Sequence, residues 1–135
     1  MSAVALELDG VLGDTRPLWE AWLADVSRRA HVDAGSLDEE LPNWRALLER
    51  FAEDHAPVYL QPSARATAAL RRLQRDGVRI GVFSEAPEEL ARIAVAHLGA
   101  SRRIAALESG PGALERLLAR LPGARVVRTL AELDS

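Results

Sequence analysis

Hydrophobic and polar positions alternate along this chain in blocks that predict strands and helices in turn. Short apolar runs bounded by glycine, proline or charged residues are typical of buried strands, and apolar residues recurring every three or four positions indicate amphipathic helices. The predicted strands span residues 3–8, 78–83, 103–107 and 125–127. The predicted helices span residues 17–29, 44–55, 63–76, 87–99 and 113–121. Strands that alternate with helices favour an α/β fold with a parallel sheet and right-handed crossovers.

The first two helices form an insertion between the first and second strands. They flank a polar loop, residues 31–42, in which we expect a helical turn. The single domain, residues 1–135, therefore divides into a core of residues 1–16 and 57–135 and a helical insertion over about residues 17–56.

Three tryptophans, Trp19, Trp22 and Trp44, all lie in this insertion. The spacing of Trp19 and Trp22 places them on one helix face, so we expect the three rings to form the insertion's small core. The alternative is a lid over a crevice or a dimer surface, because Trp is enriched where proteins bind one another.

Acidic and hydroxyl side chains follow two of the predicted strands at their carboxyl ends. Glu7 and Asp9 end the first strand and precede Gly10, whereas Ser84 and Glu85 end the second. In an open α/β sheet the ligand crevice lies outside the carboxyl ends of the strands, so these residues are candidates for one site. Ser84 has a simpler alternative role, which is to start the helix that follows it.

The composition of the chain counts against several classes of partner and binding site. A chain of 135 residues that is 48% hydrophobic and 27% charged is typical of a globular protein with its own core. A net charge of −3 gives no reason to expect nucleic acid or anionic membranes as partners, and no run approaches the roughly 20 apolar residues of a membrane helix. The chain has no cysteine, which excludes disulfides and thiolate sites, and its three histidines lack metal-ligand spacing.

The N-terminus does not read as a signal peptide because Glu7 and Asp9 interrupt its apolar segment, so we expect a cytoplasmic protein. All 17 basic residues are arginine, and this lysine-free, alanine-rich composition is typical of a GC-rich bacterial genome.

Two motifs resemble those of the haloacid dehalogenase (HAD) superfamily. The run Glu7-Leu8-Asp9-Gly10-Val11 is similar to its first motif, with Asp14 as the expected N-cap of the first cap helix, and Ser84 stands at the hydroxyl of its second motif. The resemblance implies a Rossmannoid three-layer sandwich with strand order 4-1-2-3 and a small two-helix cap.

The resemblance also implies roles for these residues. Glu7 stands at the nucleophile and Asp9 at the general acid/base. Gly10, Ser84 and Glu85 stand at the phosphate-binding positions. Mg²⁺ would be held by Glu7 and Asp9, with Glu108 as a further candidate, since Mg²⁺ prefers oxygen ligands that include carboxylates.

Four departures from the family pattern leave the expected fold intact but count against the family's activity. The nucleophile position holds Glu7 where the family has Asp, and a carboxylate, Glu85, adjoins the phosphate position. The family's third-motif lysine is absent, so an arginine would have to replace it, the candidates being Arg102, Arg103 and Arg116. No acid follows the last strand, where the family places magnesium ligands.

The motif matches and the departures together leave three candidate functions. The first is a catalytically degenerate HAD-like protein that binds phosphate or a phosphorylated metabolite, or acts as a regulatory module. The second is a weak Mg²⁺-dependent phosphatase acting on a small phosphorylated metabolite. The third is a structural protein that self-associates, as in a homodimer, through the exposed edge of strand 125–127.

Overall fold

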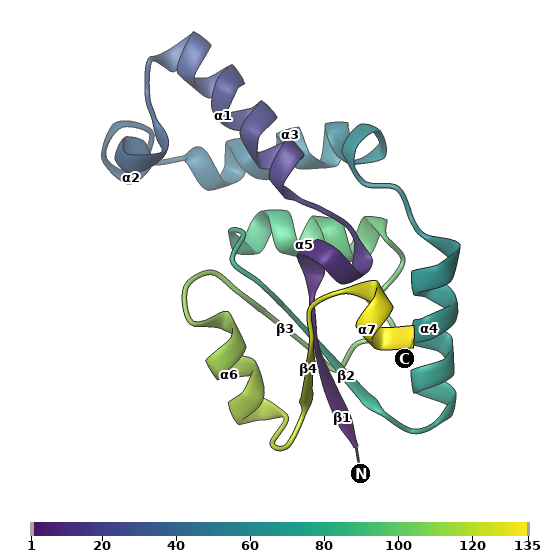
Figure 1. The fold of residues 1–135 in the computed structure, drawn as a ribbon. Helices are drawn as coiled ribbons and strands as arrows, with labels where there is room; N and C mark the ends of the chain where they lie inside the picture. Colours follow the sequence, from purple (N-terminus) through teal and green to yellow (C-terminus); the bar gives the residue numbers. More distant parts are fainter. Residues whose placement is uncertain (1, 135) are drawn as a thin grey trace.

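The structure, a computed structural model, describes residues 2–134 and is built on a four-stranded parallel sheet. The strands are β1 (Ala3–Glu7), β2 (Arg79–Ser84), β3 (Ala106–Ser109) and β4 (Arg125–Val127). Their order is β3-β2-β1-β4, which is the predicted order 4-1-2-3 (Figure 1). Because β1 is central, its carboxyl end meets those of both β2 and β4.

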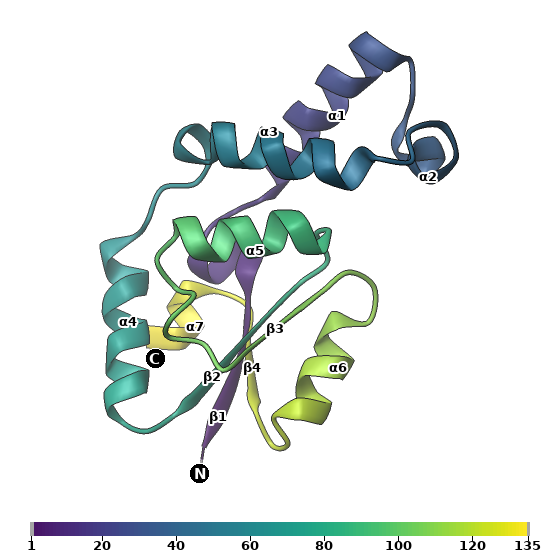
Figure 2. The same ribbon diagram turned by 180° about the vertical axis from the view of Figure 1, so that it is seen from behind.

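Helices cover both faces of the sheet, which confirms the predicted three-layer architecture (Figures 1 and 2). One face is covered by α6 (Ala113–Arg120), and the other by α4 (Ala64–Arg75), α5 (Glu88–His97) and α7 (Leu130–Asp134). Side chains alternate along the strands, so Ala5 and Phe83 pack with α6 while Leu6 and Val82 join the core on the opposite face.

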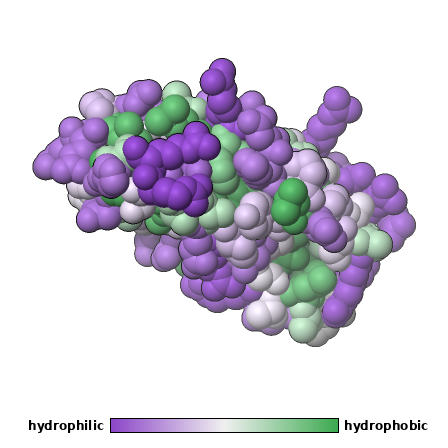
Figure 3. Space-filling model, turned by 90° about the horizontal axis from the view of Figure 1, so that it is seen from above, coloured by the Kyte–Doolittle hydropathy of each residue, from purple (hydrophilic) through white to green (hydrophobic). Residues whose placement is uncertain are grey.

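Residues 16–59, between β1 and α4, form the cap, which lies across the carboxyl end of the sheet (Figure 1). It contains α1 (Arg16–Ala30), a 3₁₀ turn (Ala34–Ser36), the single-turn helix α2 (Leu37–Glu40) and α3 (Trp44–Tyr59). The 3₁₀ turn and α2 are the helical turn predicted within the loop. Seen from the cap side, hydrophilic residues surround several separate hydrophobic patches (Figure 3).

The three tryptophans pack together in the cap. The ring centroids lie 5.4 Å apart for Trp19 and Trp22, 6.0 Å for Trp22 and Trp44, and 6.2 Å for Trp19 and Trp44. Trp22 and Trp44 are buried and Trp19 is partly buried. The expected tryptophan core of the cap is therefore present, and Trp19 retains an accessible surface.

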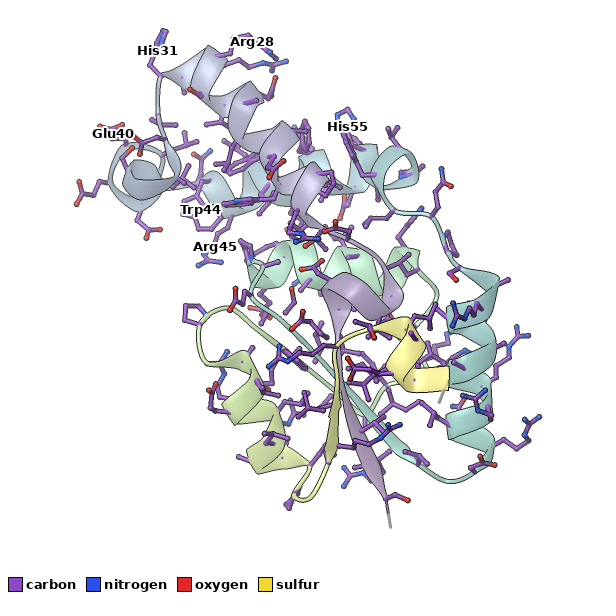
Figure 4. The ribbon with its side chains drawn as sticks, viewed as in Figure 1. Arg28, His31, Glu40, Trp44, Arg45 and His55 are labelled. Atoms are coloured by element: carbon purple, nitrogen blue, oxygen red, sulfur yellow. The ribbon has the colours of Figure 1, made fainter. Side chains whose placement is uncertain are left out.

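The cap is fixed to the core along α3 and α5. Arg45 pairs with Glu89 at 2.9 Å, and Glu49 pairs with Arg92 at 2.5 Å. In Figure 4 the side chain of Arg45 extends from the start of α3 toward the core. Together with the apolar packing between these helices, the two ion pairs hold the cap over the sheet.

Two helix boundaries in the cap differ from the prediction. Helix α3 continues through Pro57 to Tyr59 instead of ending near His55. Pro57 removes one hydrogen bond, to the carbonyl of Glu53, but Glu53 is exposed to water and the buried Leu60 closes the last turn on Ala56. The N-cap position of α1 is Thr15, whereas Asp14, predicted for it, lies one residue earlier and accepts the N–H of Arg16.

Two further differences lie in the core. Strand β3 begins at Ala106, three residues later than predicted, because residues 101–103 form a turn in which the N–H of Arg103 donates to the carbonyl of Ala100. Helix α7 was not predicted, although Thr129 and Glu132 form a capping pattern in which the Thr129 hydroxyl accepts the N–H of Glu132 at 3.2 Å. None of the helices in the described part of the chain combines the length and apolar character that crossing a bilayer requires.

Candidate functional site

A cleft of about 480 Å³ opens at the carboxyl end of the sheet, beneath the cap. Four of the predicted site residues line it, namely Glu7, Asp9, Ser84 and Glu85. Two arginines that the sequence did not single out, Arg16 and Arg128, line it as well. The first turn of α6 completes the wall opposite the cap.

Glu7 forms an ion pair with Arg128. The parallel register pairs Leu6 with Val127, so the next residue on each strand, Glu7 and Arg128, leaves the sheet edge side by side. Nη1 of Arg128 lies 2.5 Å from Oε2 of Glu7, and its guanidinium also lies 5.5 Å from the centre of the Phe83 ring. A guanidinium therefore stands beside the carboxylate, directly after the strand where the family pattern places a magnesium-ligating acid.

Asp9 fixes the chain between β1 and the cap. Its Oδ1 accepts the backbone N–H of Thr15 at 2.7 Å and the Thr15 hydroxyl at 2.9 Å. Thr15 is only 2% exposed, so these bonds anchor the start of α1 to the turn after β1. Asp9 thus lines the cleft with one carboxylate oxygen already engaged.

Gly10 adopts, in the same turn, a backbone conformation that favours glycine. Its φ is +119°, and a Cβ there would lie 2.5 Å from the carbonyl oxygen of Arg128. Its N–H donates to the carbonyl of Gly13 at 3.0 Å. Glycine is therefore required for the close approach to the chain after β4, and its phosphate-binding role stays a prediction.

Ser84 is the last residue of β2 and is buried, whereas Glu85 follows it and is exposed. Ser84 is 1% exposed, and its Oγ accepts the N–H of Ala86 at 3.1 Å. Since that bond uses a lone pair, the hydroxyl hydrogen can still be donated. Glu85 is exposed at the mouth of the cleft, where its negative charge opposes an anion.

Arg16 brings a second guanidinium to the cleft from the cap. Its Nε lies 2.8 Å from Oδ1 of Asp14, and this hydrogen bond lowers the pKa of the Asp14 carboxyl and raises the pKa of Arg16 further above its usual range. The Arg16 side chain remains 72% exposed and can reorient toward a ligand.

Glu108 is held outside the cleft by two arginines of α6. Arg120 and Arg116 donate to its two carboxylate oxygens at 2.7 and 2.9 Å. These hydrogen bonds, the one from Arg120 first, lower the pKa of Glu108. The candidates for replacing the family's lysine are likewise placed elsewhere, because Arg116 is engaged with Glu108 while Arg102 and Arg103 line a separate surface depression.

Arg128 is the arginine that reaches the predicted nucleophile position instead. Its place directly after the last strand was the signal that could have identified it, since parallel strands present their carboxyl ends at one edge.

The three carboxylates expected to hold Mg²⁺ are each engaged with protein groups and do not form one metal site. Glu7 is paired with a guanidinium, Asp9 is bonded to Thr15, and Glu108 is bound by two arginines. Across residues 2–134 no three His, Cys, Asp or Glu side chains gather as a metal site would require. His31 and His55 lie on the outer side of the cap, away from the sheet (Figure 4). A divalent cation would have to displace Arg128 from Glu7.

Comparison with known proteins gives structural matches only. No family model matches the sequence, and no curated protein matches it either. Among solved structures, CbbY from Rhodobacter sphaeroides in complex with phosphate matches with a TM-score of 0.72 and 13% identity, over 95% of this chain and 76% of that one. A mutant of the same CbbY, in complex with xylulose-1,5-bisphosphate, matches with a TM-score of 0.64, 13% identity and the same coverage.

A proposed beta-phosphoglucomutase from Thermotoga maritima also matches, with a TM-score of 0.59 and 20% identity over 95% of this chain and 75% of that one. All three similarities extend through both the sheet and the cap region, since they cover nearly the whole chain. With the strand order and the two sequence motifs, they show that this chain has the fold of the haloacid dehalogenase-like phosphatases.

Proposed function

We propose that this protein binds a small phosphorylated molecule in the cleft between cap and core and does not hydrolyse it. The observation that carries the proposal is the ion pair between Glu7 and Arg128. A guanidinium therefore lies beside Glu7, the carboxylate expected at the nucleophile position, and a metal ion would have to compete with it.

Hydrolysis through Glu7 is disfavoured by geometry as well as by charge. Glu is one methylene longer than Asp, which moves the carboxylate by about 1.5 Å. A misplacement of about 1 Å can cost about 100-fold in a reaction that depends on near-attack geometry. In addition, a carboxylate that accepts a charge-assisted hydrogen bond from Arg128 is a weaker nucleophile.

Binding an anion is favoured by three donors around the cleft. Arg128 from the core and Arg16 from the cap present guanidinium groups, whose planar forks suit phosphate oxygens. Ser84 can donate its hydroxyl from the end of β2, and the first turn of α6 adds the positive end of a helix dipole.

The remaining carboxylates of the cleft determine which chemical groups a ligand can carry beside its phosphate. Asp9, Glu85 and Glu115 accept hydrogen bonds, so they suit a ligand that carries N–H or O–H groups. The same carboxylates oppose a multiply charged anion. The fold neighbour CbbY in its complexes with phosphate and with xylulose-1,5-bisphosphate supports a phosphorylated organic molecule as the ligand class.

Titration calorimetry tests this proposal with inorganic phosphate and with a panel of phosphate monoesters. We expect measurable heats for the wild type and at least a roughly tenfold weaker affinity for Arg128→Met, because a phosphate contact worth about 1.4 kcal/mol is lost. Arg125→Met is the matched control, since Arg125 lies at the opposite end of β4. Absence of heat with every ligand at millimolar concentration would refute the proposal.

Self-association through β4 stays a separate prediction. The strand has only three residues and begins with the exposed Arg125, two features that discourage edge-to-edge pairing. Sedimentation at high protein concentration tests it, since a purely monomeric species would rule it out.

A further inference from the structure

A second cavity of about 490 Å³ adjoins the cleft and lies between the cap and the core. Asp9, Arg16 and Glu85 line both spaces, so one ligand can extend from one into the other. A volume of this size is within the range of small-molecule sites.

The walls of the second cavity are largely apolar and aromatic. The cap contributes Trp19, Trp44 and Leu37, and the core contributes Ala86 and Pro87 at the turn before α5. This lining contrasts with that of the cleft, where carboxylates and guanidinium groups predominate. The phosphate and the rest of the ligand would therefore meet chemically different surroundings.

The aromatic wall is held in place before any ligand arrives. Nε1 of Trp44 donates to Oδ1 of Asp38 at 2.7 Å, and the guanidinium of Arg45 lies 4.4 Å from the centre of the Trp44 ring. The Trp19 ring meets Trp44 edge to face, at 69°. Trp19 packs against Trp22 and Trp44 but is only partly buried, so its ring is positioned before binding and still accessible, which reduces the entropic cost of binding.

We propose that the ligand carries a planar aromatic or heteroaromatic group beside its phosphate and that this group is bound against Trp19 in the second cavity. This inference rests on the proposed function and narrows its ligand class. Aromatic rings gain stabilisation from edge-to-face or offset contacts that aliphatic groups of equal size lack. Asp38 and Glu85 on the rim accept hydrogen bonds from N–H or O–H groups on such a ring.

The test compares phenyl phosphate, cyclohexyl phosphate and inorganic phosphate by calorimetry and by tryptophan fluorescence. Phenyl and cyclohexyl phosphate have similar size and charge, so their difference isolates the aromatic contact. We expect phenyl phosphate to bind about fivefold more tightly than cyclohexyl phosphate and to change the emission of the wild type. In Trp19→Leu this preference should disappear, while the affinity for inorganic phosphate stays unchanged.

Two further variants keep the test decisive. Trp19→Phe should retain the preference, which guards against misfolding of Trp19→Leu, and Leu47→Ala, an exposed change on α3 outside both cavities, should behave as the wild type. Equal affinities for phenyl and cyclohexyl phosphate in the wild type would overturn the inference and leave the proposed function standing. Absence of binding by all three compounds, inorganic phosphate included, would overturn both.

Discussion

The guanidinium of Arg128 and the carboxylate of Glu7 leave two adjacent parallel strands and pair at 2.5 Å across the sheet edge. Both residues stand where the family pattern requires something else, an aspartate nucleophile and a magnesium-ligating acid. The two charges compensate each other, because the guanidinium of Arg128 supplies a positive charge beside the carboxylate of Glu7.

A double-mutant cycle measures this pairing directly. Combining Glu7→Gln with Arg128→Met should reveal a coupling of about 0.5 kcal/mol in the free energy of unfolding, because the side chains are 31% and 54% exposed and solvent weakens the pair. Urea denaturation of the four proteins gives the value. The same cycle between Glu7→Gln and Arg125→Met should be additive, and equal coupling in both cycles would show that the pair is not specific.

Replacement of Gly10 tests the packing of the first turn against the chain after β4. Gly10→Ala should lower the free energy of unfolding by about 3 kcal/mol, because the new Cβ meets the carbonyl of Arg128 and φ is +119°. Gly99→Ala is the matched control, since its φ is +76° but a Cβ there has nothing within 4 Å. It should cost about 1 kcal/mol. Equal costs in chemical denaturation would mean that the close approach to Arg128 is absent.

Acid should lower the free energy of unfolding in part because it protonates Glu108. Its pKa is lower in the folded chain than its ordinary value of 4.5, so folding is favoured by its ionised form above that value. As pH falls through the folded-state pKa, Glu108 is protonated and this contribution is lost. The difference in unfolding free energy between the wild type and Glu108→Gln should therefore shrink from pH 6 toward pH 3.

Glu39→Gln, at an exposed position of α2, controls for removing one carboxylate from the surface. A Glu108→Gln difference that stays constant down to pH 3 would contradict the pairing of Glu108 with Arg116 and Arg120.

Truncation of Trp22 tests the tryptophan core of the cap. Trp22 is 2% exposed and packs against both other indoles, so Trp22→Ala should cost about 3–5 kcal/mol of folding stability. Leu47→Ala, at a side chain that is 38% exposed, should cost less than about 1 kcal/mol. Equilibrium unfolding followed by far-UV circular dichroism compares the two, and similar costs would show that the cap lacks a packed core.

Much of the fold could be predicted from the sequence, because it depends on local periodicity. The apolar run before Glu7 and the alternating helices predicted a parallel sheet, and the spacing of Trp19 and Trp22 predicted the cap core. The strand order followed only from the family resemblance. Boundaries were less predictable where tertiary contacts decide them. Pro57 is accommodated in α3 because Glu53 is exposed and Leu60 is buried, and neither fact is visible in the local sequence.

The candidate site was predictable only in part. Glu7, Asp9, Ser84 and Glu85 could be assigned to one cleft because each lies at or just after the carboxyl end of a strand, at the same edge of the sheet. The partner of Glu7 could not, because Arg128 lies 121 positions away and only the strand register brings the two together. The role of Gly10 was likewise obscured, since the carbonyl that excludes a side chain there belongs to that same distant residue.

Whether the cleft binds phosphate esters without hydrolysing them is tested most directly by a hydrolysis assay with p-nitrophenyl phosphate and Mg²⁺ on the wild type, Asp9→Asn and Glu7→Gln. We expect the wild type to release no more p-nitrophenol than the two variants, because Glu7 is paired with Arg128. Mg²⁺-dependent release by the wild type that is lost in both Asp9→Asn and Glu7→Gln would contradict it.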